Sequence, residues 1–116
     1  RQAAERPVPV EPELFQLLQA ARGWTEETEG AFDLTSGPLI RLWGAALRAG
    51  TLPLDEEIAA ARGRVGMQFV QLDAASRTVR FLRPGMELHF GAMGKGYALG
   101  RAGAHLRRLG VGGAFL

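Results

Sequence analysis

A glycine-rich stretch around Lys95 has the residue types best suited to holding a phosphate group. Residues 88–100 read LHFGAMGKGYALG, so four glycines and one lysine lie between an apolar run and a helix-like run. Glycine lets the backbone approach a ligand closely, and the start of a helix offers unpaired N–H groups and a partial positive charge. Together with the lysine ammonium group, these features suit the phosphates of a nucleotide.

The spacing of the glycines excludes one phosphate-binding motif and leaves another open. A Walker A loop has a glycine where His89 stands and a serine or threonine where Gly96 stands, so we exclude that loop. The segment from Gly94 to Gly100 follows G-x-G-x-x-x-G, a relative of the dinucleotide fingerprint. Two interpretations remain at this point: the glycines approach a phosphate, or they only permit a tight turn and close helix packing.

A second polar cluster lies in residues 28–44, which read TEGAFDLTSGPLIRLWG. Asp33 and Thr35 predict an Asx or Ser/Thr turn that caps a helix beginning near Pro38. The alternative is that Asp33 accepts hydrogen bonds from a ribose or a base. Phe32 and Trp43 are predicted to be core aromatic residues.

Two histidines complete the titratable candidates. His89 alternates with Leu88 and Phe90, which places it on the polar face of a predicted strand, either as an acid–base group or as a half-exposed histidine. His105 is expected to lie on the surface. The spacing of His, Asp and Glu indicates no metal site, and no serine has the context of a nucleophile elbow.

Composition is typical of a folded domain. The chain has 116 residues, of which 47% are hydrophobic and 22% charged, and it contains no cysteine. This excludes disulfides, thiolate metal sites and cysteine nucleophiles, and a disordered chain is not expected. The net charge is only +2 with dispersed basic residues, which indicates a solvated surface and no nucleic-acid partner.

Apolar periodicity predicts an α+β fold, in which N-terminal helices are followed by a β-hairpin and a strand–Gly-rich loop–helix–strand unit. In the first helix Gly23 is the predicted stop, and Asp55 is the predicted cap of the third. We expect residues 1–116 to form a single partial domain that lacks N-terminal and C-terminal parts. The predicted elements are an extended or linker-like segment at 1–10, helices at 11–22, 38–47, 55–62 and 95–109, hairpin strands at 69–72 and 78–82, and strands at 86–90 and from 111.

Each of the main predicted helices has one apolar face that should point inward. The predicted inward residues are Leu14, Leu17, Leu18 and Ala21 in the first helix, Leu39, Leu42, Trp43 and Ala46 in the second, and Ala98, Ala102, Leu106 and Leu109 in the last.

Taken together, the two clusters resemble the ApbE family. The resemblance lies in TEGAFDLT at 28–35, followed by Pro38-Leu39 and Leu42-Trp43-Gly44, and then in GAMGKGYA at 91–98. It extends from about residue 8 to residue 116. The family consists of FAD:protein FMN transferases, also described as thiamine-biosynthesis lipoproteins, and it implies an ApbE-like or T-fold-like fold.

The resemblance also implies roles for particular residues. Ala31, Phe32, Asp33 and Lys95 map onto positions that contact FAD, and His89 occupies the position of an aspartate that contacts it. Ala92 maps onto a Mg²⁺ ligand, for which only its carbonyl oxygen is available. The implied reaction transfers FMN from FAD to a threonine or serine hydroxyl of a target protein, with release of AMP.

Two departures from the family pattern lead to a choice between hypotheses. His89 and Gly100 each stand where the family has aspartate, and the aspartate and threonine that complete the family's metal site have no counterpart in these residues. We therefore predict that the 116 residues alone do not catalyse the transfer, although the parent protein would. The alternatives are a degenerate, non-catalytic module that binds FAD or another nucleotide, and a structural domain whose glycine loop only packs.

The resemblance further implies partners and a location. The expected partners are FAD and a target protein carrying the acceptor Thr or Ser. Membrane contact is expected only through a possible lipid anchor of the parent protein. The implied location is the bacterial periplasm or the outer face of the inner membrane.

Overall fold

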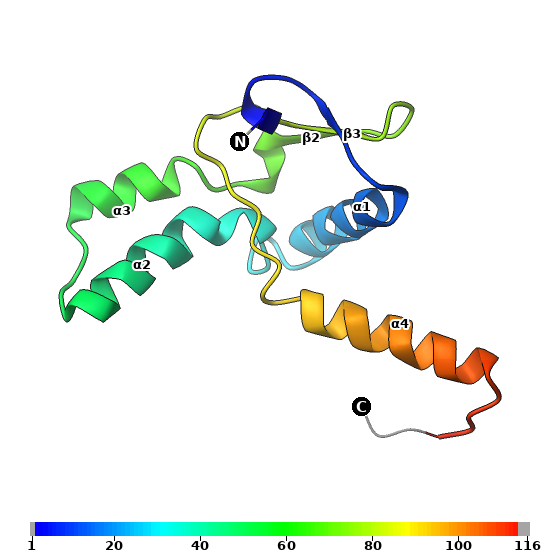
Figure 1. Cartoon of the computed structure of the whole chain (residues 1–116). Helices are drawn as coiled ribbons and strands as arrows, with labels where there is room; N and C mark the ends of the chain where they lie inside the picture. The colour runs from blue at the N-terminus through cyan, green and yellow to red at the C-terminus, as the bar shows by residue number, and fades with distance from the viewer. Residues whose placement is uncertain (1, 114–116) are drawn as a thin grey trace.

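A computed structural model describes residues 2–113, and its centre is a small antiparallel sheet with strand order β1-β3-β2 (Figure 1). The strands are β1 (Val8–Pro9), β2 (Val70–Asp73) and β3 (Thr78–Phe81). Val79 of β3 lies opposite both Val8 and Leu72. Because side chains alternate along a strand, this register puts the apolar residues of the three strands on one face.

Residues 2–113 also contain four α-helices, of which α2 and α3 extend to one side of the sheet as a pair and α4 projects away from it, and the α+β fold class is confirmed (Figure 1). Helices α2 and α3 form a helical hairpin. Helix α4 begins directly after the turn at residues 91–93, which we call the glycine-rich turn. The helices are α1 (Pro12–Glu27), α2 (Gly37–Ala49), α3 (Asp55–Arg62) and α4 (Gly94–Arg108), and three short 3₁₀ turns are η1 (Gln2–Ala4), η2 (Leu34–Ser36) and η3 (Met67–Phe69). No helix among residues 2–113 is long and apolar enough to span a membrane.

One apolar cluster joins α1 and the sheet to the two segments that carry the candidate site. Leu34 of η2 and Met93 of the glycine-rich turn both belong to it. Phe32, Leu88 and Phe90 pack against it as half-buried side chains. The buried members are Leu18, Ala21, Leu34, Met67, Val70, Val79, Phe81, Met86 and Met93. The Asp33 region and the glycine-rich turn therefore pack against the same apolar core.

The molecule is more extended than a compact domain of this length. Its radius of gyration is 17.0 Å and its extents are 55 × 39 × 25 Å, whereas the usual scaling gives about 13 Å for the radius of gyration. Helix α4 projects from the sheet and helices (Figure 1) and contains no buried residue. The predicted inward face of α4 is therefore wrong, since Ala98, Ala102 and Leu109 are exposed and Leu106 is only half-buried.

The predicted strand at 86–90 is wrong in backbone structure, although its apolar alternation is real. Met86 is buried and Leu88 and Phe90 are half-buried, but the segment joins no sheet. Its backbone instead bonds to η2, where the His89 N–H donates to the Leu34 carbonyl. Residues 111–113 also form no strand, and 114–116 lie outside the described residues.

Several helix boundaries and orientations also differ from the predictions. Helix α1 continues past Gly23 to Glu27, because a glycine within a helix costs only about 1 kcal/mol and tertiary contacts can outweigh that. Asp55 lies inside α3, and the Glu57 carboxylate caps the helix instead by accepting from the Leu54 N–H at 2.8 Å. Trp43 is 41% exposed, so it is no core residue.

The predictions for the inward face of α1 and for the conformation of the N-terminal segment were wrong in smaller details. Of the inward face predicted for α1, Leu18 and Ala21 are buried, but Leu14 is exposed and Phe15 is buried in its place. In the segment predicted as extended or linker-like, Val8 and Pro9 are extended as strand β1 and pair with β3, whereas Gln2–Ala4 form the 3₁₀ turn η1.

Candidate functional site

The two polar clusters predicted from the sequence lie side by side in the fold. The His89 N–H donates to the Leu34 carbonyl at 2.7 Å, and the Arg41 guanidinium forms an ion pair with the Glu87 carboxylate. Gly37 packs so closely on Glu87 that an added Cβ would lie 2.9 Å from the Glu87 Cβ. The segment around Asp33 therefore runs along the chain that leads into the glycine-rich turn (Figure 1).

Asp33 caps η2 through its carboxylate. Its Oδ1 accepts from the Thr35 N–H at 2.7 Å and from the Thr35 hydroxyl at 2.6 Å. Its Oδ2 accepts from the Met67 N–H at 3.2 Å. This confirms the predicted Asx turn, but the cap is on η2 and not on the helix at Pro38, because the N-cap of α2 is Ser36. Three protein donors therefore already occupy the Asp33 carboxylate.

The Thr35 hydroxyl links the Asp33 turn to the backbone at Gly66, a role that was not predicted from the sequence. The Thr35 side chain is fully buried, and its Oγ1 donates to Asp33 while accepting from the Gly66 N–H at 2.6 Å. Gly66 has a φ of +142°, which favours glycine. The Asp-x-Thr spacing before a helix indicates a local turn at Thr35. It does not indicate that the Thr35 hydroxyl also bonds to Gly66, which lies 31 residues away in sequence.

Ala31 and Phe32 form the turn that leads to Asp33. The Ala31 N–H donates to the Thr28 carbonyl at 3.0 Å, and the Phe32 N–H donates to the Thr28 hydroxyl at 3.0 Å. The Phe32 ring packs edge-on against Trp24, with ring centroids 5.8 Å apart. Ala31 is exposed and Phe32 is half-buried, so the turn presents its backbone to solvent while Phe32 anchors it.

Lys95 lies on the first turn of α4 with an exposed side chain. The Gly94 N–H donates to the Phe90 carbonyl at 2.7 Å, and the Tyr97 N–H donates to the Met93 carbonyl at 2.9 Å. Helix geometry leaves the intervening N–H groups of Lys95 and Gly96 without intrahelical acceptors. An added Cβ on Gly96 would meet nothing within 4 Å, so the side of the helix at Gly96 is open.

His89 and Ala92 are both exposed beside this turn. The Gly91 N–H donates to the His89 Nδ1 at 3.4 Å, which holds the imidazole next to the glycine backbone. Ala92 offers only its carbonyl oxygen to a cation. No group of three or more His, Cys, Asp or Glu side chains within residues 2–113 is placed to hold a metal, so the described side chains do not by themselves fit a Mg²⁺ site.

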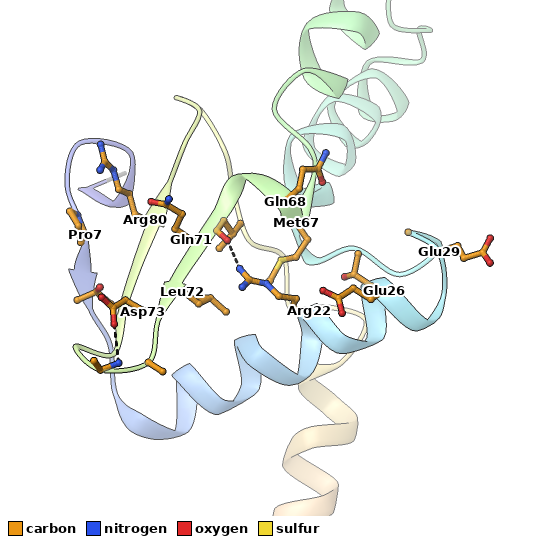
Figure 2. A pocket seen from close by; sticks show the side chains of 16 residues that line it. Pro7, Arg22, Glu26, Glu29, Met67, Gln68, Gln71, Leu72, Asp73 and Arg80 are labelled. Carbon is orange, nitrogen blue, oxygen red and sulfur yellow. Dashed lines mark hydrogen bonds between the residues drawn. The ribbon is translucent and has the colours of Figure 1, made fainter.

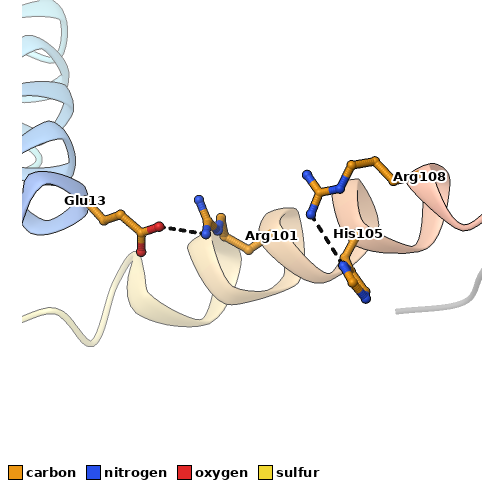
Figure 3. A network of polar contacts seen from close by, with 4 residues as sticks. All are labelled: Glu13, Arg101, His105 and Arg108. Atoms are coloured by element: carbon orange, nitrogen blue, oxygen red, sulfur yellow. Dashed lines mark hydrogen bonds and ion pairs between the residues drawn. The ribbon is translucent and has the colours of Figure 1, made fainter.

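Helix α4 is tied to α1 at the surface (Figure 3). The Arg101 guanidinium contacts the Glu13 carboxylate at 2.8 Å, and farther along the helix Arg108 contacts the His105 Nδ1 at 3.4 Å. His105 is exposed, as predicted. Only the first of these two contacts joins α4 to α1, because Arg108 and His105 both belong to α4.

A cavity of about 1170 Å³ lies along the edge strand β2 and reaches Glu29 and Gly30 of the polar cluster at 28–44 (Figure 2). Arg22, Gln71, Asp73 and Arg80 are among the residues that line it. Arg22 donates to the Val70 carbonyl on the open edge of β2. None of the predicted site residues lines this cavity, so it is separate from the region around Lys95.

Comparison with known proteins identifies the family. A model of the ApbE family matches residues 1–116. The chain belongs to the ApbE family. An FAD:protein FMN transferase of Klebsiella pneumoniae is 36% identical to it over 106 residues, which are 91% of this chain and 34% of that protein. A relative of the same name from Treponema pallidum is 32% identical over 101 residues, covering 83% of this chain and 28% of that protein.

Solved ApbE structures share the fold. The ApbE protein of Thermotoga maritima superposes with a TM-score of 0.77 at 36% identity, covering 85% of this chain and 32% of that one. The flavin transferase ApbE of Vibrio cholerae gives a TM-score of 0.82 at 27% identity, covering 90% of this chain and 34% of that one. The chain thus spans about a third of the length of the ApbE relatives it matches.

Proposed function

We propose that this chain is a fragment of an FAD:protein FMN transferase, and that the parent protein transfers FMN from FAD to a hydroxyl of a target protein. The observation that carries the proposal is the 2.7 Å hydrogen bond from the His89 N–H to the Leu34 carbonyl. It joins the two segments that the family resemblance assigns to FAD, and an ApbE family match over the whole chain supports it.

The turn around Lys95 suits the pyrophosphate of FAD. In the proposed reaction, the bond between the FMN phosphorus and the bridging oxygen breaks, and AMP leaves with that oxygen. The acceptor hydroxyl of a threonine or serine forms the new phosphorus–oxygen bond and loses its proton. The Lys95 ammonium and the N–H groups of Lys95 and Gly96 would bind the phosphate oxygens on which negative charge develops.

The segment from Ala31 to Asp33 is proposed to bind the same FAD molecule. Because the N–H groups of Ala31 and Phe32 already donate to Thr28, this turn can offer its carbonyl oxygens, and Phe32 fixes the turn against Trp24. The Asp33 carboxylate has roughly four lone-pair directions, of which the three donors from Thr35 and Met67 use most. Direct contact from this carboxylate to a ribose or base is therefore limited to the remaining direction.

Mg²⁺ dependence is a further part of the proposal. Mg²⁺ requires near-octahedral oxygen coordination, and Ala92 can contribute one carbonyl oxygen. The described residues do not complete such a site, so no step is derived through the metal. We expect that the 116 residues alone do not turn over FAD with Mg²⁺, because this cation shell is incomplete.

The proposed location and architecture follow the family resemblance. We place the parent protein in the bacterial periplasm or at the inner membrane, with a lipid anchor as its membrane attachment. The radius of gyration of 17.0 Å and the absence of buried residues among those of α4 support a partial domain that packs against further structure.

A degenerate FAD-binding module is the second candidate, and His89 favours it. An imidazole at this exposed position replaces an aspartate of the family, so a carboxylate contact to FAD is lost. Replacing His89 with aspartate in the parent protein separates the candidates. Measurable FMN transfer before the replacement supports the enzyme, whereas transfer that begins only after it supports the degenerate module.

FAD titration of the chain tests the proposal directly. We expect Lys95→Ala to weaken FAD binding by roughly one to two orders of magnitude, because a hydrogen bond to a charged group is worth about 1.5–3 kcal/mol. Arg107→Ala is the matched control, since Arg107 is an exposed cation near the other end of α4. Equal affinities for the two variants would contradict the proposal.

A further inference from the structure

The buried hydroxyl of Thr35 joins two segments that are far apart in sequence. It donates to the Asp33 Oδ1 at 2.6 Å and accepts from the Gly66 N–H at 2.6 Å, while the Asp33 Oδ2 accepts from the Met67 N–H at 3.2 Å. We call Asp33, Thr35, Gly66 and Met67 the Thr35 clamp. Its hydroxyl is fully buried and Gly66 is buried, so water cannot replace these bonds without a rearrangement.

The Thr35 clamp also sets the position of the chain that enters the glycine-rich turn. Leu34 lies between the two clamp residues Asp33 and Thr35, and its carbonyl accepts from the His89 N–H. The direction of that carbonyl depends on the 3₁₀ turn that Asp33 caps. A change in the clamp should therefore reach the turn around Lys95 through one backbone hydrogen bond.

We propose that Thr35 is a positioning residue for nucleotide binding, and that the Asp33 carboxylate acts within the Thr35 clamp rather than as a direct ligand of the nucleotide. This inference rests on the proposed function. Thr35 fixes the position of the turn at Ala31 and Phe32 relative to the turn at Lys95, so that one FAD molecule contacts both turns. Without the hydroxyl, the two segments remain in the protein but lose their fixed relation.

Thr35→Val tests the inference, because valine keeps the shape of threonine and removes its hydroxyl. The measurement is the affinity for FAD by titration, at a temperature at which circular dichroism shows the variant to be folded. We expect at least a tenfold loss of affinity, together with faster amide exchange at Gly66 and Met67. Thr35→Ser restores the hydroxyl and should keep the affinity within about threefold, since a serine hydroxyl has the same donor and acceptor capacity.

Phe15→Leu is the control for a general loss of stability. Phe15 is buried on α1 but is not a member of the core cluster that contains Leu34. This variant should lower the free energy of unfolding while leaving FAD affinity within about threefold.

The outcomes separate the inference from the proposed function. If the wild-type chain binds FAD and folded Thr35→Val binds it equally well, the inference is wrong and the proposed function stands. If Phe15→Leu weakens binding as much as Thr35→Val does, the effect is one of stability and the inference is also wrong. If neither the wild-type chain nor the parent protein binds FAD, the proposed function and the inference fail together. If only the parent protein binds FAD, the same variants are compared in the parent protein.

Discussion

At the scale of single residues, the candidate site depends on a few polar atoms that the core has placed. The Thr35 hydroxyl is buried and satisfied, and no buried side-chain nitrogen or oxygen among the described residues lacks a partner. The Lys95 side chain is exposed and near the same region. The structure therefore combines a rigid internal support with an accessible cation, the arrangement that a phosphate-binding turn requires.

Gly66→Ala should destabilise the protein by about 1–3 kcal/mol, the cost of a strained backbone conformation. Gly66 has a φ of +142°, and an added Cβ would lie 2.7 Å from the Gln68 side chain. The measurement is the free energy of unfolding in denaturant.

Gly100→Ala is the matched control for this prediction. Gly100 lies within α4, and an added Cβ there would meet nothing within 4 Å, so we expect a gain of about 0.5–1 kcal/mol. A Gly66→Ala variant as stable as the wild type would contradict the observed backbone conformation.

At the scale of elements, much of the secondary structure was predictable because it depends on local periodicity. The β2–β3 hairpin, the hairpin helices and α4 all occur near their predicted positions. The segment 86–90 was mispredicted because apolar alternation reports which side chains face the core, not whether the backbone has a neighbouring strand. The Asx turn at Asp33 was predicted from the sequence, although it caps η2 and not α2, whereas the bond from Asp33 to Met67 depends on tertiary packing that the sequence does not reveal.

The β2–β3 hairpin should be sensitive to acid through Asp73. The backbone N–H of Ser76 and then that of Ala75 donate to the Asp73 Oδ1, and these bonds hold the pKa of Asp73 below its usual value. Because the folded pKa is the lower one, the stabilisation is present above the usual aspartate pKa of about 3.9. It is lost as the pH falls through the depressed pKa.

NMR titration of the Asp73 carboxyl and of the Ser76 amide measures this dependence. We expect both to report the same lowered pKa, and we expect Asp73→Asn to remove the transition at Ser76. A pKa for Asp73 at or above the usual value would contradict the hydrogen bonds of the turn.

Helix α4 should exchange its amide hydrogens much faster than α1. None of its residues is buried, whereas α1 buries Phe15, Leu18 and Ala21. The ion pair between Arg101 and Glu13 is exposed and should contribute less than about 1 kcal/mol. Hydrogen exchange of the isolated chain is the measurement, and protection in α4 equal to that in α1 would contradict this account.

At the scale of the whole molecule, function is proposed to arise where two sequence clusters converge on one core. Sequence motifs indicated both clusters, but only the fold shows that Leu34 and His89 are hydrogen-bonded neighbours. The family match covers the entire chain, while the chain spans about a third of its relatives. The convergence is therefore a property of this part of the ApbE fold and can be tested in it.

NMR mapping of FAD binding tests this convergence most directly. The account predicts that the amides of Ala31, Phe32, Lys95 and Gly96 shift together during titration and follow one dissociation constant. Shifts confined to one of the two segments, or shifts at Arg22 and along β2 without them, would contradict it.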